Sequence, residues 1–162
     1  MFLPPNGVPL GGLERLHVML RESALKDRAI VVRPHPRFRG QEEWHAHEVR
    51  WDRNAEVDTP TLLAASICSM TFGSTVSAES WAVGTPSAFF QIGWAYEELD
   101  ALYRNLVDVP RIRTTGQFHD FMAAVVDGKW KGHAKSIERS LGATASGWRV
   151  LEELIMTRKG FA

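Results

Sequence analysis

The segment Arg33-Pro34-His35-Pro36-Arg37 is the most unusual group of polar side chains in the sequence. It places one imidazole and two guanidinium groups on a short stretch that contains two prolines. Proline fixes its own φ and pushes the preceding residue toward extended backbone, so the stretch forms a stiff turn. Arginine and histidine on such a turn can bind a phosphate without first ordering a flexible loop. The alternative is a proline turn whose histidine bonds a local carbonyl and whose arginines are solvated.

A second candidate anion site is the segment Gly73-Ser74-Thr75, which follows an apolar run and precedes a helical pattern. The start of a helix offers free N–H groups and the positive end of a dipole. Gly73 allows an anion to approach the backbone, and the two hydroxyls add donors. The alternative role for Ser74 or Thr75 is to cap the helix.

Two carboxylates could accept hydrogen bonds from sugar hydroxyls near these loops. Glu79 lies about one helical turn beyond Gly73-Ser74-Thr75, and Asp58 precedes Thr59-Pro60 at an expected helix start. Capping of that helix is the competing role for Asp58. A solvated position or an arginine partner is the competing role for Glu79.

The remaining histidines and the single cysteine do not form a metal or nucleophile pattern. His45 and His47 can share one face of an extended segment, but their spacing is not that of a helical zinc site, and no second cluster completes a ligand set. Cys68 is expected to be a buried small apolar residue. We therefore expect no metal and no cofactor.

Missing motifs and charge balance exclude several classes of protein. The sequence has no G-x-G-x-x-G, no P-loop lysine pattern and no G-x-S-x-G elbow, which disfavours a dinucleotide dehydrogenase, a P-loop NTPase and a hydrolase triad. Lys plus Arg and Asp plus Glu are 19 each, so the global positive charge of a nucleic-acid binder is absent. We expect no nucleic-acid partner.

The elements that must position these loops alternate between short apolar runs and helical patterns, which predicts βαβ units. Strands are expected at 29–32, 48–51, 67–72, 87–90 and 106–109, with Phe2-Leu3 as the stub of another. Helices are expected from Leu13 to Ala24, after Thr59, after Thr75, over 96–103, and after Thr114, whose spacing to Gln117 is that of a capping box. One apolar face is expected in the first of these helices (Leu13, Leu16, Leu20 and Ala24) and another in the helix after Thr114 (Phe118, Phe121, Met122 and Val125). The prediction is one α/β domain over 1–162, a Rossmann-like doubly wound, mostly parallel sheet with C-terminal helices at 131–162.

Taken in order, four segments resemble a known family pattern: Val31-Val32-Arg33-Pro34-His35-Pro36, 58–63, 73–79 and Gly84-Thr85-Pro86. They look like the C-terminal, nucleotide-binding half of GT-B glycosyltransferases, especially bacterial capsule polysaccharide enzymes that use CMP-activated sugars. The resemblance covers about residues 28 to 95. Each motif is short, so order and spacing carry the match.

The resemblance implies roles for individual residues. His35 would contact the donor phosphate, stabilise the departing nucleotide and be the catalytic residue, with Arg33 and Arg37 beside it. Gly73, Ser74 and Thr75 would bind the same phosphate, and Glu79 and Asp58 would hold ribose or base. A GT-B enzyme has two such domains, and the other half commonly supplies the acceptor site and the base. The chain is therefore expected to be incomplete without an upstream domain or a separate acceptor-binding chain.

The expected function is to bind a nucleotide-sugar donor, CMP-linked in preference to UDP-linked, within a glycosyltransferase of surface polysaccharide synthesis. Two alternatives stay open: a UDP-N-acetylglucosamine 2-epimerase-like domain, and a non-catalytic subunit that binds a nucleotide or a protein. No stretch approaches the ~18 apolar residues of a membrane span, and the N-terminus lacks the blocks of a signal peptide. A cytoplasmic location is expected, and peripheral contact with the inner membrane is compatible with it.

Overall fold

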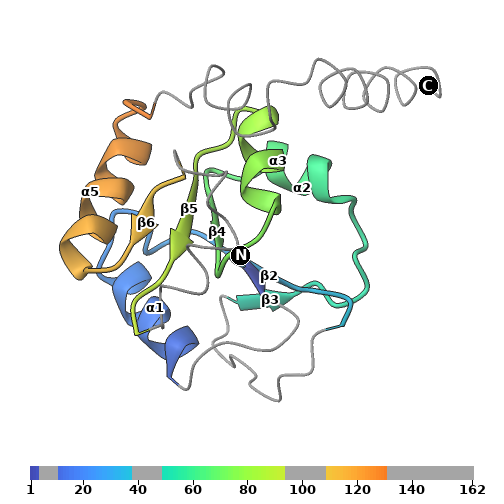
Figure 1. Ribbon diagram of the computed structural model, residues 1–162, viewed down its shortest axis with the longest axis horizontal. Coiled ribbons are helices and arrows are strands. Elements are labelled where there is room, and N and C mark those ends of the chain that lie inside the picture. The colour runs from blue at the N-terminus through green and yellow to red at the C-terminus, as the bar shows by residue number, and fades with distance from the viewer. Residues whose placement is uncertain (4–10, 38–48, 94–108, 131–162) are drawn as a thin grey trace.

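A single parallel sheet of six strands forms the centre of the computed structural model, which describes residues 1–3, 11–37, 49–93 and 109–130 (Figure 1). The strand order is β3-β2-β1-β4-β5-β6, and all five neighbouring pairs are parallel. The strands are β1 Phe2–Leu3, β2 Ile30–Pro34, β3 Val49–Trp51, β4 Ser69–Thr71, β5 Ser87–Phe90 and β6 Arg111–Ile112. The predicted doubly wound α/β fold is confirmed.

Helices cover both faces of the sheet. They are α1 Gly12–Arg21, α2 Thr59–Ala64, α3 Val76–Ala82 and α5 Thr115–Val126. Helices α1 and α5 lie together on one side of the strands, and α2 and α3 lie together on the other (Figure 1). Since both faces are covered, the strands β1, β4 and β5 carry only apolar or small side chains, as buried parallel strands require, whereas β2, β3 and β6 each contain one arginine.

The larger hydrophobic cluster fills the space between the sheet and the α1–α5 side. Leu13, Leu16 and Met19 come from α1, and the buried stripe of α5 meets them over the strands. That stripe consists of Phe118, Phe121, Met122 and Val125, as the sequence predicts. Met19 is a further buried residue of this helix, and the predicted Leu20 is partly buried against the same cluster. The predicted Ala24 is exposed, because α1 ends at Arg21.

The interface between α3 and the sheet is built largely from hydroxyl groups. The buried Ser69 hydroxyl hydrogen-bonds both Ser80 (2.9 Å) and Ser87 (2.8 Å). Thr71 Oγ1 lies 3.1 Å from Ser77 Oγ. Small side chains let the helix approach the strands closely, and their pairing avoids unsatisfied buried polar atoms. This network fixes the start of α3, where Gly73-Ser74-Thr75 lies.

Three sequence predictions need correction or lie wholly or partly outside the described residues. Of the strand predicted at 106–109, only Val109 is among the described residues, and the strand that pairs with β5 is Arg111–Ile112. Val109 instead is a buried core residue beside Trp81 and Phe89, so its apolar character reflects packing and not strand pairing. The helix predicted at 96–103 and the C-terminal helices at 131–162 lie outside the described residues.

Within the described residues, no helix combines the length and the apolar character needed to cross a bilayer.

The capping box at the start of α5 allows a direct test of how much a local capping bond stabilises the fold. Thr114 Oγ1 accepts a hydrogen bond from Gln117 N (3.2 Å), and Gln117 Oε1 accepts one from Thr114 N (3.2 Å). Replacing Thr114 by Ala should lower the free energy of unfolding by about 1 kcal/mol, because the Gln117 N–H, which has no partner within the helix, loses its acceptor. Urea denaturation measures this. Thr115→Ala, at the next exposed position, is the control, and an equal loss in both variants would contradict the capping role.

Candidate functional site

The strand order reverses direction between β1 and β4, and this position is where doubly wound sheets bind ligands. From β1 the chain moves outward to β2 and β3, then crosses back to β4 and continues to β5 and β6. The connections leaving β1 and β4 therefore diverge to opposite faces of the sheet. In doubly wound sheets such a divergence is where ligands bind, outside the carboxyl ends of the two strands.

His35 lies directly beside the carboxyl end of β1. Its backbone N–H donates to Leu3 O (3.0 Å), so the turn after β2 is anchored to the last residue of the central strand. The Arg37 backbone N–H donates to His35 Nδ1 (3.1 Å). Because Nδ1 is the acceptor, the ring proton of the neutral imidazole is on Nε2. The exposed His35 side chain thus offers a donor to solvent beside the carboxyl end of β1.

The Gly73–Thr75 loop lies on the other side of β1. Phe2 pairs with Arg33 of β2 and with Thr71 of β4, so these three residues lie side by side across the sheet. His35 and Gly73 each lie two residues further toward the carboxyl end of their strands. One strand separates them, which corresponds to about 10 Å between the backbones. A group over the end of β1 is therefore within side-chain reach of both loops.

The loop geometry combines an open backbone with hydroxyl donors. Gly73 has φ +90°, a conformation that a residue with Cβ rarely adopts. Ser74 Oγ accepts from Val76 N (3.2 Å) and so caps the first turn of α3, while its hydroxyl hydrogen is still able to donate. The exposed Thr75 makes no side-chain capping bond. Ser74 therefore satisfies one free N–H of the first turn from the position before the N-cap residue, which is Thr75.

Arg33, predicted beside the phosphate, is buried and makes a different set of contacts. Its guanidinium pairs with the buried Asp52 through Nε (3.1 Å) and Nη2, and it also donates to Val57 O (2.5 Å) and Thr59 Oγ1 (3.2 Å). These bonds use four of the five N–H groups of the side chain. Arg33 therefore ties β2 to the end of β3 and the start of α2.

Two other arginines supply exposed cations at this edge of the sheet. Arg37, predicted from the sequence, is exposed and has no side-chain partner among the described residues. Arg15, which sequence reasoning did not select, lies in the first part of α1. Its Nη1 is 3.0 Å from where a Cβ on Gly93 would lie, so it reaches the carboxyl end of β5. The sequence did offer a signal for Arg15: it is an arginine four residues after Gly11, near the start of the first helix after the central strand.

The two predicted carboxylates differ in their environment. Asp58 is the N-cap of α2: Oδ1 accepts from Thr61 N (3.0 Å) and Oδ2 from Thr61 Oγ1 (2.8 Å). The capping alternative is confirmed for Asp58. Glu79 lies in the first turn of α3, one turn past Thr75, where partial desolvation raises the pKa of its carboxyl.

The described residues hold no group of three His, Cys, Asp or Glu side chains that could bind a metal ion. His45 and His47 lie outside those residues. Cys68 is at the opposite edge of the sheet, just before β4, and burial raises its pKa to about 11. It is therefore a thiol at neutral pH, in keeping with the predicted packing role.

Replacing Asp52 by Asn should expose the structural role of the Arg33–Asp52 pair. The hydrogen bond from Arg33 lowers the pKa of Asp52 below its usual 3.8, so the pair stabilises the fold fully above that value and is lost as pH falls through the folded-state pKa. At pH 7 the variant should lose about 3 kcal/mol, because a buried arginine loses its counter-charge. Between pH 4 and 2 its unfolding free energy should fall less steeply than that of the parent protein, as measured by urea denaturation.

The matched control for this variant is Glu56→Gln. Glu56 pairs with Arg50 at 2.5 Å on the surface, where both side chains are more than half exposed. Solvent screening leaves such a pair worth less than about 1 kcal/mol. Equal pH profiles for Asp52→Asn and the parent would contradict the role of the buried pair.

Comparison with known proteins identifies no relative of the chain. No family model, no curated protein sequence and no solved structure matches it. What the site can do must therefore be argued from its own geometry and from the motifs of the sequence.

Proposed function

We propose that this chain is the nucleotide-sugar-binding domain of a glycosyltransferase, with CMP-linked donors preferred, acting in surface or capsular polysaccharide synthesis. The observation that carries the proposal is the position of the two predicted anion loops. They flank the carboxyl end of β1, next to the reversal of strand order. The sequence motifs that resemble GT-B glycosyltransferases contribute the reaction class.

The donor phosphate is proposed to lie over the end of β1, between His35 and Gly73-Ser74-Thr75. The His35 imidazole has its Nδ1 occupied by Arg37 N, so Nε2–H is the group that can donate to a phosphate oxygen. The hydroxyls of Ser74 and Thr75 can donate from the other side. Arg37 and Arg15 add positive charge, which the phosphate of the departing CMP needs as it becomes a dianion.

These donors suit bond cleavage as well as binding. When the glycosidic bond breaks, negative charge grows on the phosphate of the leaving nucleotide. Fixed donors aimed at that phosphate stabilise the transition state more than the ground state. His35 is the residue proposed to contribute most, since its backbone is fixed to Leu3 and its ring by Arg37 N.

The nucleoside is proposed to extend toward α3, where Glu79 can accept hydrogen bonds from ribose hydroxyls. Asp58 is the weaker candidate, because both of its carboxylate oxygens already accept hydrogen bonds from Thr61. In the GT-B enzymes that the motifs resemble, a second domain binds the acceptor and supplies the base. We propose that this chain acts together with such a domain.

Nucleotide binding by the purified domain tests the proposal directly. CMP and CDP should raise the thermal midpoint, since a ligand at 100 times its Kd adds about 2.7 kcal/mol to the unfolding free energy. His35→Ala should weaken CMP binding by about 10- to 100-fold, the value of one hydrogen bond to a charged group. Because His35 is exposed, the midpoint of the free variant should change little.

His119→Ala is the control for that variant, because His119 is an exposed imidazole on α5. It should bind CMP as the parent protein does. If saturating CMP, CDP and UDP all leave the midpoint of the folded domain unchanged, the proposal is wrong.

Thr75 offers a second test that separates its hydroxyl from its shape. Thr75→Val removes the hydroxyl and should weaken CMP binding about 5- to 10-fold, whereas Thr75→Ser keeps it and should stay within about twofold of the parent. Isothermal titration calorimetry measures both. Because Thr75 makes no capping bond, a loss of binding in the valine variant would not come from loss of the helix. Equal affinities in the two variants would remove Thr75 from the site.

A further inference from the structure

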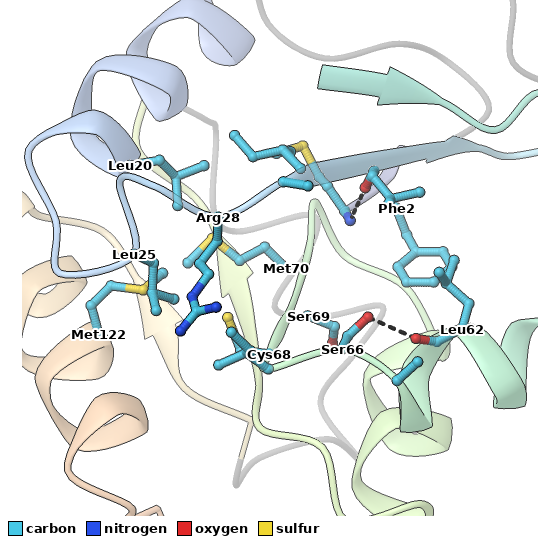
Figure 2. A pocket seen from close by; sticks show the side chains of 16 residues that line it. Phe2, Leu20, Leu25, Arg28, Leu62, Ser66, Cys68, Ser69, Met70 and Met122 are labelled. Carbon is cyan, nitrogen blue, oxygen red and sulfur yellow. Dashed lines mark hydrogen bonds between the residues drawn. The ribbon is translucent and has the colours of Figure 1, made fainter. Parts of the chain in front are cut away.

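The two edges of the sheet present different side chains. Figure 2 shows the pocket at the amino edge, whose lining is mostly apolar and includes Leu25, Met70 and Met122. The carboxyl edge is polar on the face that α2 and α3 cover. The residues that follow the strands on that face are His35 after β2, Gly73 after β4, Gln91 after β5 and Arg113 after β6.

Gln91 lies beside Gly73 at the carboxyl edge. Thr71 of β4 pairs with Phe89 of β5, and Gly73 and Gln91 are each two residues further along their strands. Gln91 is also held to β6, because its backbone N–H donates to Ile112 O (2.8 Å). Side chains alternate between the faces of a sheet, so Gln91 is on the same face as Phe89, which packs against α3. Its side chain therefore lies next to the loop that precedes α3.

The carboxamide of Gln91 has a fixed orientation. The residue is only 1% exposed. Arg113 Nε, which can only donate, is 3.2 Å from Gln91 Oε1, so the atom turned toward β6 must be the oxygen. The amide nitrogen of Gln91 is therefore turned away from β6, and β4 is the neighbouring strand on that other side.

The amide nitrogen of Gln91 carries two N–H groups and has no hydrogen-bond partner among the described residues. Unpaired donors on a buried side chain are costly, which makes them candidates for a ligand contact. Within this part of the chain, the unpaired side-chain atoms that are closed to solvent are the indole nitrogens of Trp81 and Trp130. The Gln91 nitrogen therefore keeps contact with solvent, and a ligand can reach it.

A free guanidinium lies over the same end of β5. Arg15 Nη1 is 3.0 Å from the position that a Cβ on Gly93 would take, and Gly93 is two residues past Gln91. The exposed Arg15 side chain has no partner among the described residues. Since α1 covers the face opposite to α3 (Figure 1), the guanidinium comes from the other side of the sheet. Gln91 and Arg15 thus offer donors at the carboxyl end of β5 from both faces.

We propose that the Gln91 amide group is a further binding group for a phosphate held at the Gly73–Thr75 loop, and that Arg113 is the positioning residue that turns its nitrogen toward the ligand. This inference rests on the proposed function, which places the phosphate at that loop. An oxyanion is the matching ligand, because the hydroxyls of the loop, the Gln91 amide and the Arg15 guanidinium can all donate. His35 holds the phosphate from the side of β2, and Gln91 holds it from the side of β5.

Gln91 variants test this inference with two probes, CMP and inorganic phosphate. Gln91→Glu keeps the shape and the acceptor for Arg113 but replaces two donors by a negative charge, so it should weaken CMP binding at least 100-fold. Gln91→Met removes the carboxamide at nearly the same volume and should weaken both probes by the same factor, about tenfold. Thermal midpoints over a concentration series of each probe, against potassium chloride at equal ionic strength, give the affinities.

Thr85→Val is the matched control for a loss of stability without a loss of binding. Thr85 is buried at the amino edge of the sheet, before β5, and its hydroxyl donates to Leu63 O (2.7 Å). The variant should unfold at a lower temperature than the parent and bind both probes with the parent affinity. A fall in affinity that only followed stability would appear in this variant as well.

The positioning role of Arg113 is tested by a double-mutant cycle. Arg113→Lys keeps the positive charge and removes the Nε–H that orients Gln91. It should weaken CMP binding about threefold in the parent and have no effect in Gln91→Met, because a positioning residue acts only through the group that it holds. Equal losses in the two backgrounds would overturn this role.

The two probes separate this inference from the proposed function. Parent-like affinities in Gln91→Glu, or a loss in Gln91→Met that affects CMP and not phosphate, would overturn the inference and leave nucleotide binding in place. Phosphate binding that depends on Gln91, in a protein that does not bind CMP, would support the inference and overturn the proposed function. Absence of binding of both probes to the folded parent would overturn both.

Discussion

The two-residue strand β1 is the constraint on which the rest of this structure depends. It pairs with β2 on one side and β4 on the other, so it alone joins β2 and β3 to β4, β5 and β6. Its neighbour β2 is fixed in register by two backbone hydrogen bonds, from Arg33 N to Met1 O and from His35 N to Leu3 O. Without this short strand the two parts of the sheet would have no shared register, and the two anion loops would have no common position.

The site that we propose follows from the place of β1 in the sheet. At the carboxyl end of β1 the chain diverges to opposite faces, and His35 and Gly73-Ser74-Thr75 lie on the two sides of this strand.

Two groups of polar side chains lie near the proposed site: buried ones that hold the fold together and exposed ones on the loops. Arg33 and Asp52 form a buried pair, Asp58 caps α2, and Ser69, Ser77 and Ser80 hold α3 against the sheet. Their hydrogen bonds are satisfied within the fold. His35, Arg37 and Thr75 are exposed and lie on the loops that this framework fixes. This division makes the exposed group the better choice for mutagenesis of binding.

The sequence alone determined the features that depend on local chemistry. The capping box of Thr114 and Gln117, the start of α2 at Asp58 and the stripe of α5 all formed as predicted, because each depends on residues within one or two helical turns. The parallel α/β class also followed from the alternation of strand and helix patterns. Only the tertiary structure decided which strands are neighbours, that Arg33 turns inward to Asp52, that Val109 packs without pairing, and that Arg15 reaches Gly93. These outcomes depend on contacts between residues far apart in the chain, and local propensity carries no information about them.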